Sequence, residues 1–217
     1  MKKILLLMVS IGSILAILGS CATDDDSAAS TTSTAFSPTT TASGSITVGS
    51  ETMSGTYASD CNDLTGSSAI GQYIPSDVLA NRDVLVVTGD DNVSEEMYLY
   101  TDTTCTNLSG YLKDGNDNFT VGDASGSNYK VTYVENTFKV MAVTAAAESF
   151  YESYFSTNNI TNQGTAVDLV VGTEYSMSSN GNLYMNLYSV TSTTVQTGDD
   201  SSSTQPTAMD SAVMIKQ

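Results

Sequence analysis

The amino-acid sequence predicts an all-β protein, namely an antiparallel barrel of eight to ten strands with one short helix. Three observations support this fold class. Ser, Thr, Gly, Asn and Tyr are abundant and Trp is absent, a composition typical of surface β-proteins. Short strand signals recur between turn clusters, and long helical patterns are rare. Because exposed sheet edges invite aggregation, we expect a closed barrel rather than an open sandwich.

The strand signals are separated by Gly-, Asp- and Asn-rich turns, which we expect at 89–92, 114–117 and 135–136. The predicted strands are 54–59, 83–88, 95–102, 108–112, 118–121, 129–134, 137–144, 166–171, 183–190 and 210–216.

One segment, 145–155, has the pattern of a short amphipathic helix rather than of a strand. Its aromatic residues are spaced so that Phe150 and Tyr154 share one face, as do Tyr151 and Phe155. We expect this helix to pack against the sheet or to plug one end of it.

Residues 1–20 have the features of a secretory signal peptide. Lys2 and Lys3 form a positive n-region. The apolar stretch 4–18 is shorter than the roughly 20 residues that a membrane span needs. We therefore expect export and removal of residues 1–20.

The run Leu18-Gly19-Ser20-Cys21 resembles a lipobox, the processing signal of bacterial lipoproteins. The resemblance implies that Cys21 is acylated after cleavage, and two or more acyl chains anchor a protein firmly to a membrane. Ala22 rather than Asp follows the cysteine, which by the same resemblance favours the outer membrane in a Gram-negative cell. The expected location is the cell envelope, and the expected partner is the membrane.

The mature chain divides into a tether and one domain. Residues 21–45 are predicted to form a lipid-anchored, disordered tether, since 12 of the 19 residues in 27–45 are Ser or Thr. Residues 46–217 are long enough for a single domain with a sizeable core.

The mature chain is strongly acidic. Without residues 1–20 it keeps five basic residues against 24 acidic ones, a net charge of −19. Such a chain repels nucleic acid, because phosphate binding needs clustered Lys and Arg. The acids are spread along the sequence, so solubility explains them best, and no pair of carboxylates stands out as catalytic.

Besides Cys21, the chain has two cysteines, Cys61 and Cys105. An even number of remaining cysteines in an exported chain predicts a disulfide rather than two free thiols. Closing a loop of this size contributes roughly 4 kcal/mol in the chain-entropy model. A metal site is not expected, because the sequence has no histidine and no C-x-x-C pair.

The residues around these cysteines resemble the motifs of lipocalin-like bacterial lipoproteins and of related Wnt-antagonist ectodomains. The runs that carry the resemblance are Gly55-Thr56-Tyr57-Ala58-Ser59-Asp60-Cys61, Tyr98-Leu99-Tyr100-Thr101-Asp102-Thr103-Thr104-Cys105 and Pro206-Thr207-Ala208-Met209-Asp210. Two positions depart from the pattern: Tyr57 replaces the usual Trp, and Gln205 stands where Arg often precedes the proline. The resemblance implies a lipocalin-like barrel stapled by Cys61–Cys105 near its first strands. Most bacterial members of the group have no assigned activity.

The absence of histidine excludes Ser-His-Asp and Cys-His nucleophile systems in their usual form. The sequence also lacks a Walker loop and a dinucleotide fingerprint. We expect no enzyme activity and no cofactor.

Two functions remain. In the first, the barrel binds a small apolar ligand, which apolar strand residues and the aromatic helix residues Phe150, Tyr151, Tyr154 and Phe155 line or cap. In the second, the protein is a surface interaction or structural envelope protein without an internal ligand. Its binding face would be tyrosine-rich, with Tyr98, Tyr100, Tyr184 and Tyr188 as candidates.

Overall fold

The structure is a computed structural model that describes residues 36–162, 164–179 and 181–217. Cys21, the predicted signal peptide and the first part of the predicted tether lie outside the described residues. The elements in chain order are β1 (Ile46–Val48), β2 (Glu51–Met53), β3 (Thr56–Ala58), β4 (Asn62–Asp63), β5 (Ala80–Val87), β6 (Val93–Tyr100), β7 (Leu108–Ser125), β8 (Asn128–Ala142), α2 (Ala145–Asn158), β9 (Glu174–Met177), β10 (Leu183–Val190), β11 (Thr194–Gly198) and β12 (Met209–Lys216).

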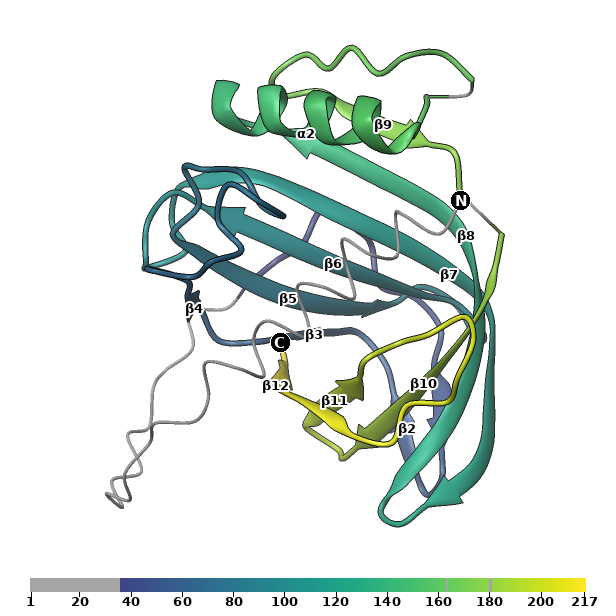
Figure 1. Cartoon of the computed structure of the whole chain (residues 1–217). Coiled ribbons are helices and arrows are strands. Elements are labelled where there is room, and N and C mark those ends of the chain that lie inside the picture. Colours follow the sequence, from purple (N-terminus) through teal and green to yellow (C-terminus); the bar gives the residue numbers. More distant parts are fainter. Residues whose placement is uncertain (1–35, 163, 180) are drawn as a thin grey trace.

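The described strands form a closed antiparallel barrel, which confirms the predicted fold class (Figure 1). The eight strands that close the ring in this part of the chain are β3, β5, β6, β7, β8, β10, β11 and β12, and β12 pairs with β3 again. The second half of β8 pairs with β9 instead of β10, so β9 extends the wall beyond the ring.

Successive residues of each strand point alternately into and out of the barrel. Tyr57 on β3 and Tyr133 on β8 belong to one buried cluster although their strands are not neighbours, so their faces point inward. The register extends this assignment along the ring. Leu85, Glu95 and Asp114 are direct cross-strand partners in turn and therefore face inward, whereas Arg82 and Lys113 face outward.

The helix predicted at 145–155 is confirmed and runs to Asn158. The Thr144 hydroxyl caps its start by accepting a hydrogen bond from the Ala147 amide at 3.1 Å. Tyr151 and Phe155 are fully buried against inward residues of β6, β7 and β8 and against the loop between β4 and β5. The helix thus closes one end of the barrel, above β7 to β9 in Figure 1.

The predicted turns at 114–117 and 135–136 are wrong, because β7 and β8 run through them as single strands of 18 and 15 residues. The turn-forming residues instead make a β-bulge. Gly115 pairs with Thr137 and Asn116 with Glu135, so Asn136 is the extra residue. A β-carbon on Gly115 would clash with the Thr137 hydroxyl as it lies, so glycine lets these two residues approach closely at the bulge.

The strand predicted at 166–171 is also wrong, since the structure has no strand there. This segment packs beside the helix, where the Leu169 amide donates a hydrogen bond to Glu152 Oε1 at 2.8 Å. Five strands were not predicted individually: β1, β2, β4, β9 and β11. Each has five residues or fewer, too short for a clear alternating pattern.

The disulfide between Cys61 and Cys105 is confirmed, with a Cα–Cα distance of 5.8 Å. It joins the segment that follows β3 to the loop between β6 and β7. The predicted disulfide cross-link near the first strands is therefore present.

Candidate functional site

The barrel interior contains a cavity of about 140 Å³. It lies among residues of β5, β6, β7, β10, β11 and β12, between the helix-covered end and the tyrosine cluster. Leu85, Met97, Ala212 and Met214 supply an apolar part of its lining. Because many barrel interiors of this size are filled by side chains, an open space among these strands marks a candidate binding site.

Carboxyl groups make up much of the remaining lining. Besides Glu96, whose carboxylate accepts hydrogen bonds from Ser94 and Tyr98 on the outer face, the acidic residues that line the cavity are Asp83, Glu95, Asp114, Asp199, Asp200 and Asp210. They come from β5, β6, β7, the end of β11 and the start of β12. Their gathering follows from strand register, which places Glu95 opposite Leu85 and Asp114 opposite Glu95. β11 pairs with β12 up to Gly198, which lies opposite Met209 after a register irregularity that begins at Gln196.

Glu95 is held by neutral hydrogen-bond donors. The Tyr188 hydroxyl donates to Oε1 at 2.6 Å, and Asn116 Nδ2 donates to Oε2 at 3.2 Å. The Tyr133 hydroxyl lies 3.4 Å from Glu95 Oε2 and 3.2 Å from Asp200 Oδ2, so its single proton serves one of two carboxyls. Tyrosine and amide donors therefore orient these groups without neutralising their charge.

The surroundings of the cavity favour the protonated forms of its carboxyl groups. Burial raises the pKa of Asp83 to about 6 and that of Asp200 to about 7. Burial also raises the pKa of Asp210 to about 7, helped by the nearby charge of Asp199 and a hydrogen bond with it. Burial raises the pKa of Glu95 as well. The cavity therefore holds acids that titrate near neutral pH.

Asp114 is the least satisfied of these groups. Its Oδ1 atom is buried and has no hydrogen-bond partner. Burial first, and then repulsion from Glu135, Glu95 and Asp200, raises its pKa well above the usual value. An isolated buried carboxylate is costly unless something pairs with it.

No basic side chain of the described residues lines the cavity. Those residues include five basic ones: Arg82, Lys113, Lys130, Lys139 and Lys216. By strand alternation, the side chains of the first four point to the outer face of the barrel. Lys216 is exposed and donates to Ser54 Oγ at 3.1 Å. The negative charge of the interior therefore has no counterpart within the described part of the chain.

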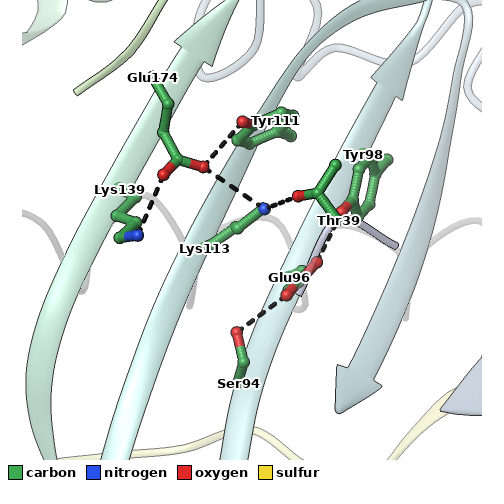
Figure 2. A network of polar contacts seen from close by, with 8 residues as sticks. All are labelled: Thr39, Ser94, Glu96, Tyr98, Tyr111, Lys113, Lys139 and Glu174. Atoms are coloured by element: carbon green, nitrogen blue, oxygen red, sulfur yellow. Dashed lines mark hydrogen bonds and ion pairs between the residues drawn. The ribbon is translucent and has the colours of Figure 1, made fainter. Parts of the chain in front are cut away.

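The outer face carries a separate polar network, shown in Figure 2, in which charges are paired. Glu174 accepts a hydrogen bond from Lys139 at 3.0 Å and one from Tyr111 at 2.8 Å, and it lies 3.5 Å from Lys113 Nζ. Burial alone would raise the pKa of Glu174, but these hydrogen bonds and the two ammonium groups lower it overall.

The same network holds the segment 36–45, part of the predicted tether, against the barrel. Lys113 Nζ donates to Thr39 Oγ1 (Figure 2), and the Phe36 ring packs edge-on against Tyr98 with centroids 4.9 Å apart. The Arg82 guanidinium lies over the Phe36 ring at 5.3 Å. Contacts of the folded domain thus include Phe36 and Thr39, ahead of residue 46.

The aromatic residues predicted to line or cap a ligand site lie elsewhere. Tyr151 and Phe155 are in the core beneath the helix, and Phe150 and Tyr154 are partly buried beside them. None of the four lines the cavity. The proposed tyrosine face is not exposed either. Tyr184 and Tyr188 point into the barrel, and Tyr98 and Tyr100 are buried on its outer side.

Sequence reasoning missed the cavity carboxylates because it treated the acids as spread along the chain. A signal was present in two strands. Asp83 alternates in phase with Leu85 and Val87, and Glu95 alternates in phase with Val93 and Met97. An acid on the apolar face of an alternating strand is expected to be buried.

Comparisons with models of known families and with curated proteins found no match to the chain. Within the described ranges, no group of three or more His, Cys, Asp or Glu side chains is arranged to hold a metal ion. No helix in the part of the chain that the structure covers is long and apolar enough to cross a membrane.

Proposed function

We propose that the protein is a lipid-anchored protein of the cell envelope whose barrel binds a small ligand. The observation that carries the ligand-binding part is the cavity of about 140 Å³ inside a closed barrel. An engineered cavity of about 150 Å³ binds benzene in another protein, so this space suits a ligand of roughly six to ten non-hydrogen atoms.

The lining also supports binding. It combines an apolar wall, including Leu85 and Met97, with polar groups held in place by neighbours such as Tyr188. Apolar surface with a few oriented polar groups is the usual composition of small-molecule sites. The sequence-based expectation of a purely apolar ligand is therefore changed to a ligand with both an apolar and a polar part.

The anchoring part of the proposal depends on the lipobox-like run that ends at Cys21. Acylation there would hold the barrel close to a membrane, and the acidic mature chain would not itself adhere to anionic lipid. With Ala22 after the cysteine, the proposed location in a Gram-negative cell is the outer membrane.

Intact mass spectrometry of the full chain extracted from native membranes tests both parts. We expect a mature mass that begins at Cys21 with two or three acyl chains, together with a co-purifying small molecule released on denaturation. A Cys21→Ser variant is the control and should lose the acyl mass. An unacylated wild-type chain would refute the anchor, and absence of any released molecule from gently purified protein would refute the ligand.

A further inference from the structure

The cavity carries negative charge that the described part of the chain does not compensate. Apart from Glu96, whose carboxylate accepts hydrogen bonds from Ser94 and Tyr98 on the outer face, six acidic residues line it, and the five basic residues of the described ranges all lie outside it. On the outer face, by contrast, Glu174 has two lysine partners. A second observation points to a missing partner, because the buried Oδ1 atom of Asp114 has no hydrogen bond.

We infer that the ligand of the barrel is a small organic cation with a protonated amine, which binds against Asp114 and its neighbouring carboxylates. This inference rests on the proposed ligand-binding function and specifies its ligand class. An ammonium group supplies the hydrogen-bond donors and the positive charge that the cavity lacks. Asp114 is the main acceptor, since Glu95 already accepts hydrogen bonds from Tyr188 and Asn116.

The lining distinguishes an organic cation from a metal ion. A metal would need several carboxylate oxygens converging on one point, and the described residues contain no such group. Leu85, Met97 and Met214 instead form a wall that an alkyl or aryl body would cover. Burying that body adds about 25 cal/mol for each Å² of apolar surface removed from water.

The net charge of the cavity depends on pH, because titratable groups from the surrounding strands face it. Those that face the site are Asp83 on β5, Glu95 on β6, Asp114 on β7, Tyr133 and Glu135 on β8, Tyr188 on β10, Asp199 and Asp200 after β11, and Asp210 on β12. The two tyrosines stay neutral at physiological pH, because burial raises their pKa further. Amine binding therefore strengthens from pH 5 to pH 8, as the carboxyl groups ionise.

Three probes of matched size test the ligand class by calorimetry on the full chain in a neutral detergent at pH 8. They are benzylammonium, benzyl alcohol and benzoate. We expect benzylammonium to bind at least about tenfold more tightly than benzyl alcohol, since a charge-assisted hydrogen bond in a buried site exceeds a neutral one by this amount or more. Benzoate should not bind.

Two variants on the same strand locate the interaction. Asp114→Asn should remove the preference for benzylammonium over benzyl alcohol, because the amide keeps the size of the side chain but carries no charge. Asp123→Asn, which removes the same charge from an exposed position of β7, should change neither affinity. Binding of benzylammonium at pH 5 should be at least about tenfold weaker than at pH 8.

The outcomes separate the two proposals. Equal binding of alcohol and amine, or binding of benzoate, would refute the cationic ligand and leave a ligand-binding barrel. An amine preference that survives in Asp114→Asn would refute the assigned acceptor. If no probe binds and no molecule is released from the native protein, both proposals fail.

Discussion

The barrel wall separates two acidic sites that the fold treats in opposite ways. Outside, Glu174 lies with Lys113, Lys139 and Tyr111, and its pKa is lowered. Inside, Asp200 has tyrosine as its hydrogen-bond donor and no cation, and its pKa is raised to about 7. Ionisation of the first stabilises the folded protein, whereas ionisation of the second opposes folding.

The difference shows that charge pairing here follows strand alternation rather than composition. Neighbouring positions on one strand belong to opposite systems: Lys113 points outward into the paired network, and Asp114 points inward to the cavity. Whether a charged residue has an oppositely charged partner thus depends on which face of the strand its side chain occupies. Buried charge left unpaired in this way costs stability unless a ligand compensates it.

The pH dependence of stability should give the largest contrast. Carboxyl groups whose pKa is raised in the folded state bind more protons there than in the unfolded chain between about pH 4 and pH 7. The free energy of unfolding must therefore fall as pH rises through this window. With Asp83 near 6 and Asp200 near 7, we expect a loss on the order of 3 kcal/mol between pH 5 and pH 8. Urea unfolding at the two pH values measures this loss. Greater stability at pH 8 than at pH 5 would contradict the claim that the carboxylates inside the barrel have no cationic partner.

Removal of the outer cation should have the next largest effect. Lys113→Met keeps the aliphatic stem but takes away the ammonium group that contacts Glu174 and Thr39. Because Lys113 is only 5 % exposed, we expect a loss of about 2 kcal/mol in the free energy of unfolding at pH 7. Lys130→Met, at an exposed outward position of β8, is the control and should change it by less than about 0.5 kcal/mol. Equal effects would show that the network does not stabilise the barrel.

Neutralising an inner carboxyl should do the reverse and stabilise the ligand-free protein. Asp114→Asn removes a charge that burial and neighbouring acids disfavour, so we expect a gain of about 1 kcal/mol at pH 8. Because burial raises the pKa of Asp114, the gain should be smaller at pH 5 than at pH 8, since acid favours the neutral wild-type group. Chemical unfolding at both pH values checks this, and a destabilised variant at pH 8 would mean that Asp114 has a compensating partner.

The smallest effect is expected at the outer carboxylate. Glu174→Gln breaks partly exposed ion pairs, which are worth roughly 0.5 to 1 kcal/mol near a surface. Since the pKa of Glu174 is lowered in the folded state, this contribution is present at pH 7 and disappears as the group protonates in acid. Thermal unfolding at pH 7 and pH 3 should show a lower midpoint for the variant only at pH 7. A difference that persists at pH 3 would point to lost packing instead.

The sequence predicted the fold from local patterns but could not predict the cavity. The strand at 183–190 matches β10, and Cys61–Cys105 follows from the even number of cysteines. Gly115 and Asn136 were misassigned because a bulge and a turn use the same residue types. Asp83, Glu95 and Asp114 lie on consecutive strands, but Asp199, Asp200 and Asp210 join them only through pairings between strands distant in the chain, such as β3 with β12, and no local window contains that information.

In the segment before β1, the Phe36 amide donates a hydrogen bond to Oε1 of Gln217 at 3.0 Å. Positions 36 and 217 are therefore spatial neighbours although they are far apart in sequence. A short linker could join them, and the chain could be reopened at the exposed hairpin around Gly126. Such a circular permutant would preserve every pairing of the ring while moving the chain ends, and with them the proposed attachment, to the far tip of β7 and β8.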